Sequence, residues 1–369
     1  MEIKCCHYRK GVEVLKQKIR ITLLILLLFS GVICSLFPST TAQESPVLKV
    51  AVSVTPLAGL VEATGGDLVE IFTLLPEGIE PHVAQLPQDA INAAEEADLL
   101  VFTGHFPWEE SLADTVDTPY IDLEDFEQYG AELLPFPGEE HDHALAQDEH
   151  DHEGNPHGFW LLPDNAIAIA NATRVAFTSL NSTYTETWND NFAQFVERVD
   201  SFQGLVAAMD SEYDFSSLTA VVVFPAEAYV AETFGIEPIG VLQEGENTFI
   251  SGGELLEVQE GLRNGSIDMI IGSEVALLQA GGEFATQLSQ DTDSSLAWIR
   301  TLSFPEMNDY ISLMTYNLGA VINSLNQAEA SAGEGTLTLV LVGISGGLAV
   351  IAILEAVILI QRARTEEDF

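Results

Sequence analysis

The chain has 369 residues, 47% of them hydrophobic, with 57 Asp and Glu against 13 Lys and Arg, a formal net charge of −44. This length allows two domains of ordinary size. So acidic a surface repels phosphate groups, which argues against nucleic acid as a partner, and it attracts cations at long range. Adaptation to salt or general solubility accounts for such a charge equally well, so charge alone does not indicate a function.

The N-terminal residues 1–42 are predicted to be an export signal. Six basic residues, the last of them Arg20, precede an apolar run at residues 21–37, and small residues follow at 39–42. The apolar run is long, so an uncleaved signal anchor is the alternative. All three cysteines, Cys5, Cys6 and Cys34, lie in this segment. An exported domain would therefore lack disulfides, and a metal site in it would use nitrogen and oxygen ligands.

From residue 47 the chain alternates between short β-rich runs and helical runs, which is typical of parallel sheets with crossover helices. The pattern predicts an N-terminal α/β lobe over residues 47–182. Its expected strands are residues 47–54, 69–76, 98–104 and 119–123, and its expected helices are residues 56–64, 89–97, 108–113 and one starting near Asp164, after Pro163.

A long amphipathic helix at residues 183–210 is predicted to connect this lobe to a second one at residues 211–327. Its apolar residues recur at three- and four-residue spacings, and it contains no proline, so we expect a stiff connector. The second lobe repeats the alternation of strands and helices. The expected fold class is therefore α/β, two doubly wound parallel-sheet lobes with a ligand cleft between them. The second-lobe strands are expected at residues 218–224, 236–242, 267–272 and 296–302, and its helices at 226–234, 254–263 and 309–327, with residues 275–288 mostly helical.

A second apolar run, residues 337–360, has the length of a transmembrane helix and only Glu355 as a charged residue. Arg362 and Arg364 follow in the tail, residues 361–369. Because basic residues flank both terminal apolar runs, both ends are expected on the cytoplasmic side. The acidic lobes would then be tethered to the extracytoplasmic face of the cell membrane.

Five of the eight histidines fall between residues 141 and 157. His141, His143, His150 and His152 alternate with acidic and small residues, so residues 139–156 are expected to form a solvated loop that buries little. Imidazole and carboxylate groups suit the collection of divalent cations, although a merely polar loop is the alternative. His157 differs, because it follows Pro156 and precedes the apolar residues 159–162.

With these landmarks placed, residues 47–325 resemble the zinc and manganese solute-binding proteins that deliver metal to ABC importers. The matching segments are VAVSVTPLAGLVEATGGD, EPHVAQLP, HGFWLLPDNA after an acidic histidine-rich insert, VFPAEAYVAETFGI and YISLMTYNLGAVINSL. The resemblance implies that His82 and His157 are first-lobe ligands of a zinc or manganese ion. It also implies a monomer that serves an ABC permease and ATPase and is not an enzyme. The sequence contains no GxSxG motif and no phosphate-binding loop.

The second lobe departs from this family pattern. Phe224 stands where the resemblance implies a third ligand, His or Glu, and no acid stands at residues 300–303, where it implies a fourth. Glu227 and Glu274 are candidate substitutes, and each also fits an ordinary surface acid. His105, at the end of another predicted strand, is a further candidate. The two missing ligands favour a rival function, a surface metal buffer or adhesin-like interaction protein that kept the fold.

Overall fold

The computed structural model describes residues 46–327 except 77–78, 80, 139–153, 246–247 and 303–308. The predicted export segment (residues 1–42) and the predicted span (residues 337–360) lie outside the described residues. So do four loop histidines, His141, His143, His150 and His152. Among the described residues, no helix combines the length and the apolar character needed to cross a membrane.

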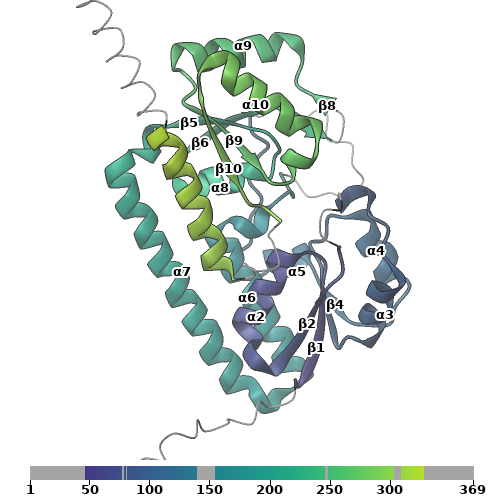
Figure 1. The fold of residues 1–369 in the computed structure, drawn as a ribbon. Coiled ribbons are helices and arrows are strands. Elements are labelled where there is room, and N and C mark those ends of the chain that lie inside the picture. Colours follow the sequence, from purple (N-terminus) through teal and green to yellow (C-terminus); the bar gives the residue numbers. More distant parts are fainter. Residues whose placement is uncertain are drawn as a thin grey trace, which may run out of the picture. The chain divides into compact units, whose positions relative to one another are not determined.

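The first lobe contains a four-stranded parallel sheet in the order β2-β1-β3-β4. The central strand β1 is buried on both faces, and Val50 pairs with Ile71 on one side and Leu99 on the other. Helices α2 and α6 cover one face of this sheet, and α3 and α4 lie on the other (Figure 1). The strands are β1 (Leu48–Val52), β2 (Val69–Thr73), β3 (Leu99–Val101) and β4 (Tyr120–Ile121), and the helices are α2 (Thr55–Gly65), α3 (Gln88–Glu96), α4 (Pro107–Ala113), α5 (Leu123–Glu127) and α6 (Pro163–Leu180).

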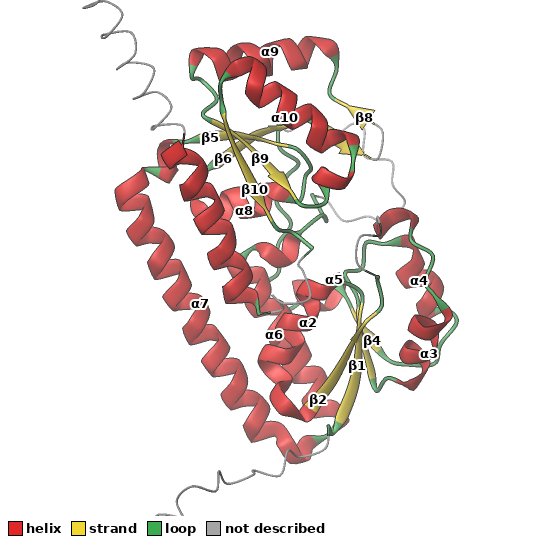
Figure 2. Cartoon of the chain, in the orientation of Figure 1, coloured by secondary structure: helices red, strands yellow, loops and turns green. Residues whose placement is uncertain are grey.

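The second lobe contains another four-stranded parallel sheet, in the order β10-β9-β5-β6. Helix α8 lies on one side of this sheet and α10 on the other (Figure 2). Residues 310–327 form a further helix. The elements are β5 (Thr219–Val222), α8 (Glu227–Phe234), β6 (Glu237–Val241), α9 (Gly252–Asn264), β9 (Met269–Ser273), α10 (Ala280–Thr292) and β10 (Ser295–Ile299), with an antiparallel pair, β7 (Gln243–Gly245) and β8 (Thr248–Phe249).

Helix α7 (Thr185–Tyr213) joins the two lobes. It packs against α2 and α6 of the first lobe and against α8 of the second. Its buried residues are spaced by three, four or seven positions, as the amphipathic pattern predicted: Trp188, Phe195, Val199, Phe202 and Val206. The expected fold class, two α/β lobes joined by a long helix, is confirmed.

Two local features differ from the sequence prediction. Helix α5 and the β7–β8 pair were not predicted, since both are short. Residues 275–288 are mostly helical, as predicted, but they are divided between a short 3-10 helix, η6 (Ala276–Leu278), and α10, which begins at Ala280. A Cβ at Gly282 would lie 2.4 Å from the backbone oxygen of Ala276, so only glycine allows α10 to start this close to η6. The other 3-10 helices are η1 (Gly66–Leu68), η2 (Pro81–Val83), η3 (Phe159–Leu161), η4 (Ser182–Tyr184) and η5 (Phe215–Ser217).

The packing of α7 leads to a stability prediction. Phe195 is 2% exposed and Leu205, on the same helix, is 40% exposed. We expect Phe195→Ala to lower the free energy of unfolding by about 3–5 kcal/mol through the lost burial and the cavity it leaves. Leu205→Ala should change it by no more than about 0.5 kcal/mol. Urea unfolding followed by circular dichroism measures both, and equal losses would show that α7 is not held by its apolar face.

Candidate metal site

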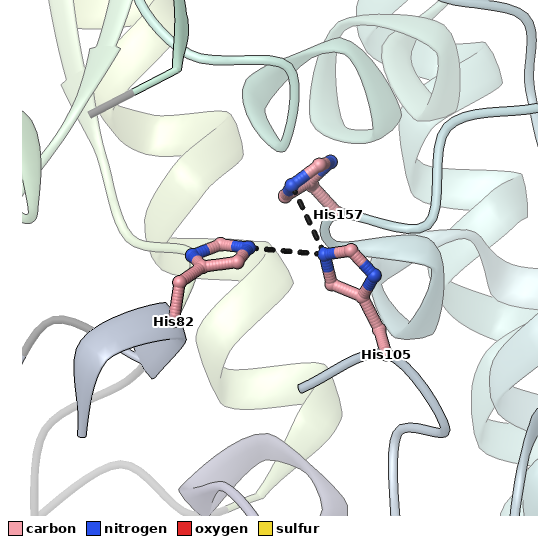
Figure 3. Close-up of side chains that lie close together, drawn as sticks. All are labelled: His82, His105 and His157. Carbon is pink, nitrogen blue, oxygen red and sulfur yellow. Dashed lines mark hydrogen bonds between the residues drawn. The ribbon is translucent and has the colours of Figure 1, made fainter. Parts of the chain in front are cut away.

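Three histidines of the first lobe converge in the structure. His82 lies in η2, on the segment after β2; His105 lies between β3 and α4; His157 lies just before η3. The Nε2 atom of His105 is 3.0 Å from Nε2 of His82 and 3.1 Å from Nε2 of His157. Figure 3 shows the three rings directed toward one another. The structure therefore adds His105 to the two histidines that the family resemblance implied as ligands.

These distances between ring nitrogens are close to the distances between the ligand atoms of a single metal ion. Zinc–nitrogen bonds of about 2.0–2.1 Å at tetrahedral angles place two ligand nitrogens about 3.3 Å apart. A hydrogen bond between two imidazoles gives a similar distance. However, Nε2 of His105 faces two other Nε2 atoms, and a single ring nitrogen offers either a proton or a lone pair. One cation bound by three lone pairs would also fit these positions.

A buried carboxylate holds the turn that carries His105. Glu109, in the first turn of α4, is 2% exposed and accepts hydrogen bonds from the backbone N–H groups of Thr103 (2.8 Å), His105 (3.1 Å) and Phe106 (3.1 Å). Burial raises the pKa of Glu109, and its hydrogen bonds with Ser53, Thr103 and Phe106 oppose that rise. Glu109 was not predicted from the sequence, although an acid three residues after the N-cap residue of a helix is a known capping signal.

His82 and His157 are each fixed by a neighbouring hydrogen bond. The indole Nε1 of Trp108 donates to the backbone oxygen of Pro81 (3.0 Å), next to His82. Asn155 Oδ1 accepts from the backbone N–H of His157 (3.0 Å) and lies 3.1 Å from its Nδ1. An amide oxygen only accepts, so this contact favours a proton on Nδ1, and in a neutral imidazole the lone pair then lies on Nε2, which faces His105. Such a partner on the second ring nitrogen is typical of metal-binding histidines.

Asn155 also connects the site to the second lobe. Its Nδ2 donates to the backbone oxygen of Pro225 (2.9 Å), and its backbone oxygen accepts from the hydroxyl of Tyr229 (2.5 Å). That hydroxyl in turn accepts from the backbone N–H of Leu134 (2.9 Å). The expectation that all of residues 139–156 lie in a solvated loop is wrong for Asn155. It is fully buried, because its amide and carbonyl groups bridge His157 and the second lobe.

The second lobe presents an apolar surface to the histidines. Phe224, Pro225 and Ala226 line a cavity of about 110 Å³, and the same cavity is also lined by His82 and His157. Thr301 and Leu302 line the same cavity, where the resemblance implied an acid. Among the described residues, the group that could hold a metal ion consists of the three histidines alone.

Glu227 and Glu274, the second-lobe candidates, both bind backbone N–H groups beside this cavity. Glu227 is fully buried, and its Oε2 accepts from the N–H of Phe224. Its Oε1 has no hydrogen-bond partner among the described residues. The carboxylate of Glu274 accepts from the N–H groups of Thr301 and Leu302, both at 3.0 Å. Both side chains support turns of the second lobe, and a role as metal ligand stays a prediction for each.

The burial of Glu227 predicts a pH effect on stability. Desolvation raises the pKa of Glu227 from 4.5 to about 8. Between these values the folded protein holds a proton that the unfolded chain has released, so the free energy of unfolding should fall as pH rises from about 4.5 to about 8. Glu227→Gln removes this proton and should flatten that dependence and raise the melting temperature at pH 8. Melting curves with a chelator present test this, and parallel curves for the two proteins would contradict it.

Comparison with known sequences identifies relatives. A family model described as "Zinc-uptake complex component A periplasmic" matches residues 50–324. The zinc-binding lipoprotein AdcA of Streptococcus pneumoniae is 25% identical over 305 residues, which cover 80% of this chain and 60% of the lipoprotein. The iron-binding protein YfeA of Yersinia pestis is 24% identical over 217 residues, 56% of this chain and 64% of YfeA. The chain thus spans less than two thirds of the length of these relatives.

Solved structures share the fold. FpvC from Pseudomonas aeruginosa, in complex with Mn2+, superposes with a TM-score of 0.62 at 18% identity, over 76% of this chain and 99% of FpvC. A zinc-bound deletion mutant of ZnuA gives a TM-score of 0.59 at 21% identity, over 76% and 97% of the two chains. The relatives are binding and uptake proteins, which confirms that the chain is not an enzyme. Since the family model covers more than half of the chain, this protein belongs to the family of the periplasmic component A of zinc-uptake complexes.

Proposed function

We propose that this protein binds a divalent metal ion, zinc in the first place, as the extracytoplasmic solute-binding component of an ABC importer. The observation that carries this proposal is the convergence of the Nε2 atoms of His82, His105 and His157. Three imidazole ligands favour zinc over manganese, because manganese prefers oxygen ligands. The relatives named above include a zinc-binding lipoprotein and structures with zinc and with Mn2+, so manganese is the second candidate.

In this proposal the three ligands found among the described residues all come from the first lobe. His105 takes the role that the family resemblance assigns to the position of Phe224. Glu227 or Glu274 would have to leave its backbone N–H partners to reach the metal, and the lost hydrogen bonds make either acid a poorer ligand than His105. The metal would then sit on one lobe, against an apolar wall contributed by the other.

The remaining parts of the chain fit the same role. His141, His143, His150 and His152 would collect metal without forming part of the principal site. The partners would be the permease and the ATPase of a metal importer, and the protein would act as a monomer.

A second candidate function is a surface metal buffer or adhesin-like protein. The absence of second-lobe ligands at Phe224 and at residues 300–303 favours it. The two functions differ in whether the metal reaches the cytoplasm. Uptake of radioactive zinc by cells that lack this protein alone separates them. Lower uptake supports import, and unchanged uptake supports the buffer or adhesin.

The ligand set can be tested in a chain whose four loop histidines are replaced by Asn, which leaves Asn155 in place. We expect His82→Ala, His105→Ala and His157→Ala each to weaken the tightest zinc-binding event by well over about tenfold. The loss of a side chain that only orients a metal ligand already weakens metal binding by about tenfold, and the loss of a ligand should cost more. Isothermal titration calorimetry measures this event. Glu274→Gln serves as the control and should leave zinc affinity unchanged. If His105→Ala binds zinc as tightly as the parent chain, His105 is not a ligand.

Membrane attachment through residues 337–360 is a separate part of the proposal. It rests on the length of this apolar run and on Arg362 and Arg364 after it. A chain that ends at Glu334 and carries a cleavable signal should appear in the soluble extracytoplasmic fraction, because it lacks the span. A chain that lacks only residues 361–369 should remain with the membrane. Immunoblots of fractionated cells test both, and a membrane-bound chain ending at Glu334 would place the tether elsewhere.

A further inference from the structure

The segment that carries His157 is held by the second lobe. The indole Nε1 of Trp160, in η3, donates to the backbone oxygen of Thr301 (3.2 Å). A Cβ at Gly158 would lie 3.0 Å from the backbone oxygen of Ala226, so this segment lies close to the residue that precedes α8. The position of His157 therefore depends on the second lobe as well as on the first.

All four polar atoms of Asn155 take part in hydrogen bonds. Its backbone N–H donates to the backbone oxygen of Leu134 (2.7 Å), and its Oδ1 accepts from the backbone N–H of His157 (3.0 Å). The other two atoms bind the second lobe: Nδ2 donates to the backbone oxygen of Pro225 (2.9 Å), and the backbone oxygen accepts from the hydroxyl of Tyr229 (2.5 Å). Because Asn155 is fully buried, water competes poorly for these bonds and the residue has little freedom to turn.

The hydroxyl of Tyr229 joins two backbone segments of the first lobe to α8. It donates to the backbone oxygen of Asn155 and accepts from the backbone N–H of Leu134 (2.9 Å), and these two residues are also hydrogen-bonded to each other. Tyr229 is fully buried, and burial raises the pKa of its hydroxyl, which therefore keeps its proton and remains a donor. Tyr229 thus fixes the backbone of Asn155.

The direction of the His157 ring follows from the position of Asn155. The Oδ1 atom of Asn155 lies 3.1 Å from Nδ1 of His157, and on the other side of the ring Nε2 faces His105. A movement of Asn155 would turn the ring and shift Nε2. Hydrogen-bond partners of this kind behind a metal-binding histidine contribute about 10–100-fold to metal affinity.

We propose that Tyr229 and Asn155 are positioning residues of the metal site, since Tyr229 holds Asn155 and Asn155 directs His157 toward the metal. This inference rests on the proposed metal site. The second lobe would thus tune the affinity of His157 for the metal, whichever groups complete the coordination shell. By the same coupling, bound metal would strengthen the attachment of α8 to Asn155.

The test measures zinc affinity by competition with a chromophoric chelator, in a full chain whose four loop histidines are replaced by Asn. We expect Asn155→Ala to raise the dissociation constant by about 10–100-fold, because it removes the partner of His157. Tyr229→Phe keeps the aromatic ring and removes only the hydroxyl. It should raise the constant by about tenfold, at the lower end of that range, because it acts through Asn155.

Tyr310→Phe is the matched control. Tyr310 is also buried, and its hydroxyl donates to the backbone oxygen of Leu161 (2.8 Å), at the end of η3 that is further from His157 along the chain. The substitution removes a comparable hydrogen bond between the lobes and leaves Asn155 in place. Zinc affinity should therefore stay as in the parent chain. Without metal, Tyr310→Phe and Tyr229→Phe should both unfold at a lower urea concentration than the parent chain.

Two further readouts separate positioning from general support of the fold. In a chain with His157→Ala, Tyr229→Phe should cause no further loss of zinc affinity, because the side chain that it positions is absent. The visible absorption of bound Co2+ reports on the geometry of its coordination sphere. This spectrum should change in Tyr229→Phe and should match the parent chain in Tyr310→Phe.

The outcomes distinguish this inference from the metal site on which it rests. If His157→Ala binds zinc as tightly as the parent chain, the metal site is wrong. If His157→Ala weakens binding but Asn155→Ala and Tyr229→Phe do not, the metal site stands and the positioning role is overturned. Equal losses in Tyr229→Phe and Tyr310→Phe, or a full effect of Tyr229→Phe after His157→Ala, would also overturn it. If circular dichroism shows that Tyr229→Phe does not fold, Asn155→Ala breaks the same link and decides the question.

Discussion

The proposed function requires that three imidazole nitrogens stay about as close to one another as the ligand atoms around a single metal ion. Three side chains from separate loops lose conformational freedom when they converge, so other interactions must fix them. Glu109 fixes the turn of His105, Trp108 the segment of His82, and Asn155 the ring of His157. These contacts are all hydrogen bonds from buried or half-buried groups, which water displaces poorly.

The second lobe has a different part in the site. The second lobe is hydrogen-bonded to the first lobe through Asn155 and Trp160. The Nε1 atom of Trp160 donates to the backbone oxygen of Thr301 (3.2 Å). The hydroxyl of Tyr310 donates to the backbone oxygen of Leu161 (2.8 Å), next to η3. The second lobe also contributes Phe224 and other apolar groups to the cavity that His82 and His157 line. It therefore positions and covers the site, whereas the three histidines that we propose as ligands belong to the first lobe.

Much of this arrangement was predictable from the sequence, and the remainder depended on three-dimensional packing. The alternating strands and helices and the apolar stripe of α7 are periodic patterns, which indicate a fold directly. His82 and His157 stand in recognisable motifs, whereas His105 was only a further candidate at a strand end. Glu109 and Asn155 were not found, because an acid or an amide in a loop shows neither its burial nor its partners in sequence. The terminal apolar segments lie outside the described residues, so their predicted roles rest on sequence.

A crystal structure of the zinc-loaded protein, with anomalous scattering recorded at the zinc edge, tests the central claim most directly. Our account predicts one strong anomalous peak at about 2.0–2.1 Å from the Nε2 atoms of His82, His105 and His157. It also predicts that Glu227 and Glu274 keep their backbone partners. A peak bound by a second-lobe carboxylate, with His105 turned away from the metal, would contradict the account.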